Sequence, residues 1–220
     1  MSGTGDDSGL GEELNRLFDS LRADLEATHR ARERGLTACR RTIQACGQAI
    51  RSVHRLQPDR AAQLTSDAEG ALRDAQRALD PFPNVKYAGF LHDAEKEYVE
   101  AVLTVALIDG TRPLPDRDAL GVMTPAWMCG LAEAASELRR HLLDRLREGR
   151  LEQAEQLLRA MEDVYDLLVT IDYPDALTGG LRRTTDGLRA VLERSRGDLT
   201  NSIVQARLRQ ALETRDQSEG

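Results

Sequence analysis

Apolar residues recur at every third or fourth position along almost the whole chain. Between residues 10 and 56 one side of the predicted helix is marked by Leu14, Leu17, Leu21, Leu25, Leu36, Ile43, Ile50 and Val53. This spacing is that of an α-helix with one apolar face. No segment alternates as a half-buried strand does, and aromatic residues make up only 4% of the chain. The sequence therefore predicts an all-α fold.

Proline- and glycine-containing breaks divide this pattern into about seven helices. The expected helices cover residues 10–56, 58–79, 85–108, 116–121, 124–148, 150–171 and 176–196, and an amphipathic piece at 199–212 can continue the last of them. No linker or repeat separates them, so we expect a single domain at 10–212. The polar ends, 1–9 and 213–220, are expected to be disordered tails.

Charge is unevenly distributed along the chain. The net charge of −7 argues weakly against nucleic-acid binding, yet residues 27–60 contain eight arginines and only two acidic residues. Such a segment is either a solvated helix face or a surface that neutralises phosphates. The candidate nucleic-acid-binding residues are Arg30, Arg34, Arg40, Arg41, Arg51 and Arg55.

Several classes of protein are disfavoured by composition. No apolar run approaches the roughly 18 residues needed to span a bilayer, so no membrane association is expected. The polar, acidic start does not resemble a signal peptide. The three cysteines are odd in number and lack zinc-site spacing. We therefore expect a protein of the reducing cytoplasm.

Acidic residues recur on one side of the predicted helix at 85–108. Glu97 and Glu100 are three positions apart and hence neighbours on its surface. They form either a solvated face or part of a site for Mg²⁺ or Mn²⁺, if a further helix supplies a third acid. Glu133 and Glu137 share one flank of the predicted helix at 124–148. The alternative for Glu137 is a pair with Arg140 or His141 on the same helix.

Three stretches in order resemble the translin family: "EYVEAV" at 97–102, "LAEAASELRR" at 131–140 and "LRRTTDGLRAVLE" at 181–193. The first is closer to translin-associated factor X, the nuclease-type member. The resemblance implies an elongated all-α bundle that assembles into hollow octamers of one chain or of the chain with a paralogue. It also implies binding of single-stranded RNA and single-stranded DNA, and Mg²⁺-dependent endoribonuclease activity.

The family's catalytic pair matches Glu97 and Glu100, whereas its third acid falls on Ala126 or a neighbour. Glu133 or Glu137, further along the same flank, is the expected substitute. The expected metal ligands are thus Glu97, Glu100 and Glu133, and the expected catalytic residues are Glu97, Glu100 and Glu137.

Three hypotheses follow, of which the first is a metal-dependent endoribonuclease specific for single strands. The second is an oligomer that binds single-stranded nucleic acid without cleaving it, which the alanine at 126 favours. The third is an all-α nucleotide pyrophosphohydrolase, a family that also uses E-x-x-E on helices. That family has a following E-x-x-D, where this chain has Glu137 and Arg140.

Overall fold

The computed structural model describes residues 7–110 and 113–218 of the chain, with side chains described for 9–110 and 113–217. Within these ranges there are nine helices and no strand, three of the helices being single turns of four residues. The helices are α1 (Asp7–His54), α2 (Pro58–Leu79), α3 (Pro83–Lys86), α4 (Phe90–Asp109), α5 (Arg117–Leu120), α6 (Thr124–Arg147), α7 (Leu151–Leu168), α8 (Asp175–Thr178) and α9 (Leu181–Ser218). The all-α prediction is confirmed.

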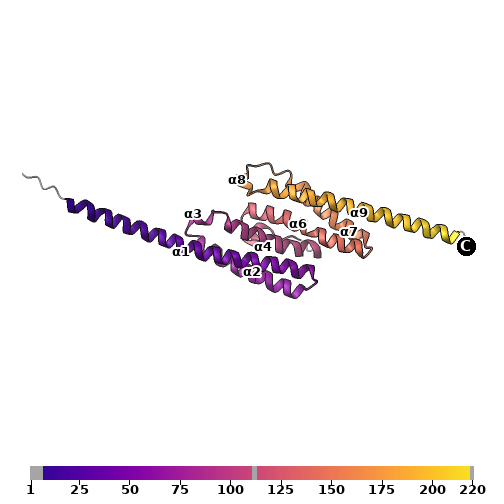
Figure 1. Ribbon diagram of the computed structural model, residues 1–220, viewed down its shortest axis with the longest axis horizontal. Coiled ribbons are helices and arrows are strands. Elements are labelled where there is room, and N and C mark those ends of the chain that lie inside the picture. The colour runs from indigo at the N-terminus through magenta and orange to yellow at the C-terminus, as the bar shows by residue number, and fades with distance from the viewer. Residues whose placement is uncertain (1–6, 111–112, 219–220) are drawn as a thin grey trace, which may run out of the picture.

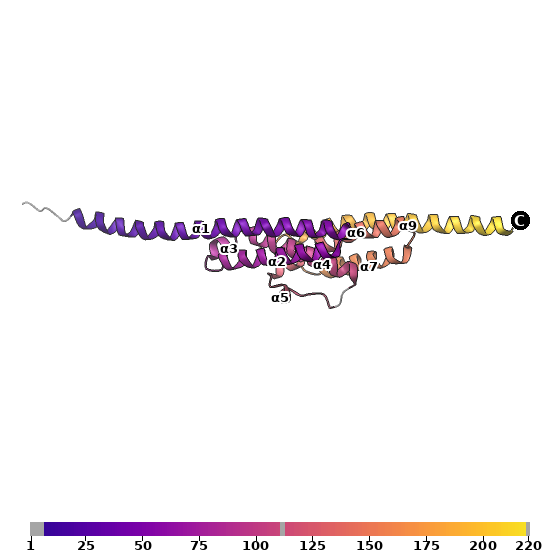
Figure 2. The same cartoon turned by 90° about the horizontal axis from the view of Figure 1, so that it is seen from below.

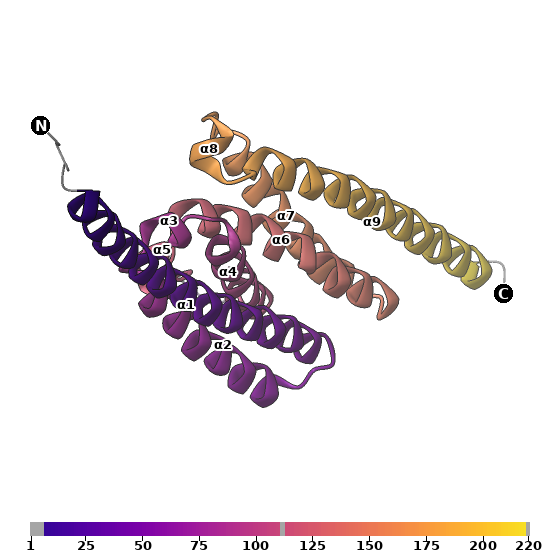
Figure 3. The same cartoon turned by 60° about the vertical axis from the view of Figure 1, so that its left-hand side comes forward.

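The long helices form an elongated bundle around α4 and α6 (Figure 3). Helix α1 packs against α2 and α4, and α6 packs against α4, α7 and α9. One continuous hydrophobic cluster joins all of these helices, and its largest fully buried side chains include Leu72, Leu103, Leu138 and Leu188. The bundle is thus a single packed body, and its middle is the place where α1, α4 and α6 meet.

Helices α1 and α9 are much longer than the body that they pack against. The first part of α1 and the last part of α9 project beyond it at opposite ends (Figures 1 and 2). The apolar side of the projecting part of α1 is exposed, with Leu10, Leu14, Leu17, Phe18, Leu21 and Leu25 each 44–70% accessible. The end of α9 similarly exposes Val204, Leu208 and Leu212.

Helix boundaries differ from the prediction in three places. The expected helix at 85–108 is interrupted, because Gly89, with φ of 100°, separates α3 from α4. The expected seventh helix, α9, begins only after the turn formed by Gly179 and Gly180, and the piece at 199–212 continues it as the sequence allows. Residues 7–9 and 213–218, expected to be disordered, continue α1 and α9 as helix. The rest of both predicted tails lies outside the described residues.

The three cysteines are free and buried. Cys39 and Cys46 lie on the side of α1 that faces the core, and Cys129 lies on α6. In the described part of the chain, no helix combines the length and the apolar character needed to cross a bilayer.

Helices α4 and α6 approach closely because α6 carries a glycine at their crossing point. A Cβ atom on Gly130 would lie 2.6 Å from the Cβ of Val99 and 2.7 Å from the backbone oxygen of Lys96. Since the backbone of α4 cannot move aside locally, we expect Gly130→Ala to push the two helices apart. The expected loss is about 1–3 kcal/mol of unfolding free energy, as for other overpacked cores, measured by urea unfolding.

Gly70→Ala is the matched control, because it makes the same change in the interior of α2 where no atom lies within 4 Å of the added Cβ. Alanine is favoured over glycine in a helix by about 0.8–1 kcal/mol, so this variant should be more stable than the wild type. Equal stabilisation by both substitutions would contradict the close contact between α4 and α6.

Candidate metal centre

Three carboxylates meet where α4 crosses α6. Glu97 and Glu100 come from successive turns of α4, and Glu133 comes from α6, one turn after the close approach at Gly130. One oxygen from each lies within 4.8 Å of the others. The structure therefore brings together the three residues that the sequence proposes as metal ligands, and oxygen donors of this kind suit Mg²⁺ or Mn²⁺.

Without a bound cation, the negative charges of the three carboxylates repel one another. The pKa of Glu100 is raised to about 8, by burial first and then by the charges of Glu133, Glu97 and Glu137, while Lys96 acts in the opposite sense. Burial also raises the pKa of Glu97, together with the charges of Glu133 and Asp93. Close carboxylates with little solvent are stabilised by a proton or by a bound cation, so the donor set fits a divalent ion.

Lys96 supplies the one cationic side chain seen among the described residues of this cluster. Its ammonium donates a hydrogen bond to Glu133 at 2.7 Å and lies 3.8 Å from Glu97. Burial lowers the pKa of Lys96. The hydrogen bond to Glu133 and the charges of Glu133, Glu97 and Glu100 raise it by more, so the pKa is raised overall. One ammonium against three carboxylates leaves excess negative charge.

A buried hydroxyl without a partner lies on α4 one turn beyond Glu100. Thr104 is fully buried, and its Oγ1 has no hydrogen-bond partner among the described residues. Buried polar groups in native proteins are almost always satisfied by protein or by ordered water. Among the described residues, this hydroxyl on the face of Glu97 and Glu100 is the one buried side-chain polar atom left without a partner.

Glu137 has a partner that neither alternative from the sequence includes. Its Oε2 lies 2.7 Å from Nε2 of His54, which comes from the end of α1. Nδ1 of His54 in turn lies 3.2 Å from Nε2 of His141 on α6. The predicted pairing of Glu137 with Arg140 or His141 is therefore wrong, because α1 brings a histidine between Glu137 and His141.

Ala126, where the family's third acid was expected, is fully buried near the start of α6. It is therefore Glu133, two turns further along α6, that reaches the carboxylates of α4. Glu137 lies one turn beyond Glu133 and close enough for its charge to raise the pKa of Glu100.

The predicted nucleic-acid-binding arginines are all exposed: Arg30, Arg34, Arg40, Arg41 and Arg51 lie on α1, and Arg55 lies in the turn that follows it. They do not form one stripe. With about 100° between successive residues, Arg40 and Arg51 lie nearest the side of His54 and the carboxylates. Arg34 and Arg41 lie toward α2, and Arg30 is 3.4 Å from Glu26 in an ion pair on its own helix.

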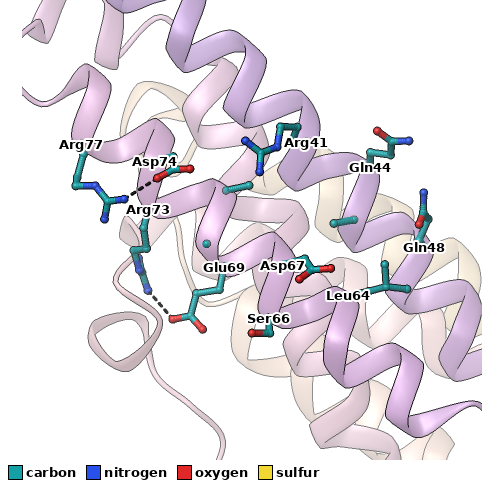
Figure 4. A pocket seen from close by; sticks show the side chains of 13 residues that line it. Arg41, Gln44, Gln48, Leu64, Ser66, Asp67, Glu69, Arg73, Asp74 and Arg77 are labelled. Carbon is teal, nitrogen blue, oxygen red and sulfur yellow. Dashed lines mark hydrogen bonds and ion pairs between the residues drawn. The ribbon is translucent and has the colours of Figure 1, made fainter.

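Arg41 borders a groove of about 880 Å³ between α1 and α2 (Figure 4). Across this groove α2 presents acidic Asp67, Glu69 and Asp74. The arginines that α2 contributes are in ion pairs, Arg73 with Glu69 at 3.5 Å and Arg77 with Asp74 at 2.6 Å. Since these acids repel phosphate, the groove is a poor place for RNA, and Arg40 and Arg51 are the stronger candidates.

His54 and Lys96 are residues of this region that the sequence does not single out, and it names His141 only as an alternative partner of Glu137 on the same helix. His54 and Glu137 are 83 positions apart, and His54 and His141 are 87 apart. No local spacing relates such residues. The only signal available is that His54 ends the basic helix on its apolar flank, which places it near the core without naming a partner.

The chain is similar in fold and sequence to solved structures of C3PO. It aligns with AfC3PO in complex with duplex RNA at 31% identity and a TM-score of 0.75, covering 87% of this chain and 98% of that one. The crystal structure of AfC3PO aligns over the same shares with a TM-score of 0.77. Apo-NeC3PO, 19% identical, shares the fold with a TM-score of 0.74 over 84% of this chain and 96% of its own.

A curated relative is an uncharacterized protein of Methanocaldococcus jannaschii, 29% identical over 203 residues, which are 91% of this chain and 87% of that protein. No family model matches the chain. The resemblance in the three stretches around Glu97, Glu133 and residue 181 thus extends over nearly the full length of AfC3PO, a translin-type protein. The chain belongs to the translin family.

Proposed function

We propose that this protein is a metal-dependent endoribonuclease of the translin type that acts on single-stranded RNA. The observation that carries the proposal is the meeting of Glu97, Glu100 and Glu133 within 4.8 Å at the crossing of α4 and α6. Support for RNA as the ligand comes from AfC3PO, a relative at 31% identity whose structure is a complex with duplex RNA.

The three clustered carboxylates would hold a divalent ion, which when bound stabilises the charge that develops on a phosphate during cleavage. Glu137 lies one turn from Glu133, and only one of its oxygens is seen bonded among the described residues. In the proposed reaction, its other oxygen accepts a proton from an attacking water as the water oxygen bonds to phosphorus. The phosphorus–oxygen bond to the leaving ribose breaks, and that oxygen takes a proton from solvent.

A nucleic-acid-binding oligomer without catalysis is the second candidate, which the buried alanine at 126 favours. A pyrophosphohydrolase is less well supported, because Glu137 is bonded to His54 and the following Arg140 offers no carboxylate. The test is incubation with labelled single-stranded RNA, duplex RNA and nucleoside triphosphates, each with Mn²⁺ and with EDTA.

We expect cleavage of single-stranded RNA with Mn²⁺ and none with EDTA. Binding of RNA without cleavage in either condition would leave the non-catalytic oligomer as the function. Hydrolysis confined to nucleoside triphosphates would indicate a nucleotide pyrophosphohydrolase. Preferential cleavage of duplex RNA would mean that the substrate is double-stranded RNA.

Arg40→Glu with Arg51→Glu should weaken RNA binding, because both side chains are exposed on the carboxylate side of α1. The loss should be similar for all RNA sequences, since phosphate contacts carry no sequence information. The log–log salt dependence should also become less steep, by about 0.7 for each phosphate that the variant no longer neutralises. Fluorescence anisotropy over a salt series measures both quantities.

Arg34→Glu with Arg41→Glu is the matched control, with the same charge change on the side of α1 toward the acidic groove. We expect a smaller loss of affinity there. A loss equal to that of the first pair would mean that α1 contributes only its general charge, and an unchanged affinity in the first pair would place the RNA elsewhere.

A further inference from the structure

Two histidines form a hydrogen-bonded chain that ends on Glu137. His54 Nε2 lies 2.7 Å from Glu137 Oε2, and His54 Nδ1 lies 3.2 Å from His141 Nε2. The side chain of His54 is 7% exposed, and His141 is 6% exposed. The chain crosses between helices, because His54 ends α1 whereas Glu137 and His141 lie on α6.

We propose that His54 and His141 are positioning residues that fix the orientation of Glu137 beside the carboxylate cluster. This inference rests on the proposed function, in which Glu137 accepts the proton of the attacking water. The hydrogen bond from His54 holds one oxygen of Glu137 and leaves the other for that proton. A glutamate on a helix surface otherwise samples several rotamers, and holding it in one geometry is what catalysis requires.

The hydrogen bonds define which nitrogen of each ring carries its proton. An ionised carboxylate only accepts, so Nε2 of His54 must donate to Glu137. In a neutral ring this leaves Nδ1 of His54 as an acceptor, and Nε2 of His141 must then donate to it. Each ring thereby sets the state of the next, as the partners of metal-ligating and catalytic histidines do.

The surroundings favour the neutral ring of His141. Burial lowers the pKa of His141, and His54 lowers it further, as do Arg145 and Arg140, while Asp144 acts in the opposite sense. The two rings are tilted by 36° with centroids 5.2 Å apart, so they meet through their nitrogens rather than by stacking. The positioning role includes both histidines. His141 has no described contact with Glu137, so it acts on Glu137 only through its hydrogen bond with His54.

Replacement of His54 by glutamine or by asparagine distinguishes a positioning role of this residue from a role in packing alone. The amide nitrogen of glutamine takes approximately the place of Nε2 and can still donate to Glu137. The asparagine side chain is too short for its amide nitrogen to reach Glu137. In the full-length protein with Mn²⁺ and labelled single-stranded RNA, we expect His54→Asn to lower kcat about 10- to 100-fold. KM should be unchanged, and His54→Gln should retain most of the activity.

His29→Asn is the matched control, since His29 is an exposed histidine on the same helix, and it should behave as the wild type. If the asparagine and glutamine variants at 54 lose activity equally, or only in proportion to a lower Tm, the histidine is structural and the inference is overturned. Wild-type protein that cuts no RNA would instead refute the proposed function.

A second measurement tests the chain without any cleavage. In protein labelled with nitrogen-15 in its histidines, both rings should carry a proton at Nε2 near neutral pH. His141→Phe should change the resonances of His54, and Glu137→Gln should do the same from the other end. A His54 ring protonated at Nδ1 alone, or one indifferent to both substitutions, would overturn the positioning role.

Discussion

Glu100→Gln is expected to lower RNA cleavage by roughly 100- to 1,000-fold, the size of effect that follows loss of a group stabilising transition-state charge. Glu100 is the most buried of the three clustered carboxylates and is surrounded by the other two. Glutamine has nearly the same shape but no charge, so the divalent ion loses a ligand while the helices keep their packing. RNA binding should survive, because the arginines of α1 are unchanged.

The same substitution should stabilise the metal-free protein. The pKa of Glu100 is raised from 4.5 to about 8. At a pH between these two values, the folded protein keeps a proton on Glu100 that the unfolded chain has lost. Its unfolding free energy therefore falls as the pH rises through this window. The fall amounts to a few kcal/mol at most, since one pKa unit corresponds to about 1.4 kcal/mol.

Urea unfolding in EDTA at about pH 5 and about pH 9 measures this effect. The wild type should lose stability between the two, and the Glu100→Gln variant should lose less. His141, whose lowered pKa costs stability on the acid side, is present in both proteins and cancels in the comparison. Added Mn²⁺ should raise the Tm of the wild type and leave that of the variant almost unchanged.

Glu152→Gln is the control for both measurements. Glu152 begins another E-x-x-E on α7 and is exposed to solvent, so its substitution should change stability by less than about 0.5 kcal/mol. If Glu100→Gln behaves like this control, the carboxylates at the crossing are a solvated face and hold no ion.

The residues that the sequence expects to share a site, and that the structure brings together, are those related by local spacing. The positions of Glu97 and Glu100 follow from a separation of three on one helix, and Glu133 follows from its place on the flank of the next long helix. Their meeting depends in addition on Gly130, which lets the backbones of α4 and α6 approach. A glycine within a helical pattern signals a close contact, but not which helix makes it.

The partner of Glu137 lies beyond such reasoning. Local rules suggest Arg140 or His141, because both are within reach on the same helix. The structure instead places His54 there, from a helix 83 residues earlier. Likewise, the count of arginines predicts an exposed basic helix correctly, but only the packing of α2 shows that Arg41 faces acidic residues.

Assembly is the second effect expected to be large. Leu10, Leu14, Leu17, Leu21 and Leu25 follow spacings of four and three on a part of α1 that projects from the body (Figure 2). Amphipathic helices in proteins are stabilised mainly by the packing of their apolar face, and such spacing suits a seam between helices. We therefore expect another copy of the chain to cover this stripe within a larger oligomer, whose mass is several times the 24.4 kDa of one chain.

Leu14→Asp with Leu21→Asp should reduce the particle mass measured by light scattering at micromolar concentration, because buried charges in an apolar seam are costly. The body does not contain these side chains, so circular dichroism should show a folded protein. Ser20→Asp with Ala23→Asp adds the same charge on other, exposed sides of the same helix and should leave the mass unchanged. A wild type that is already a monomer would contradict the assembly, and a lower mass in both variants would mean that added charge alone separates the copies.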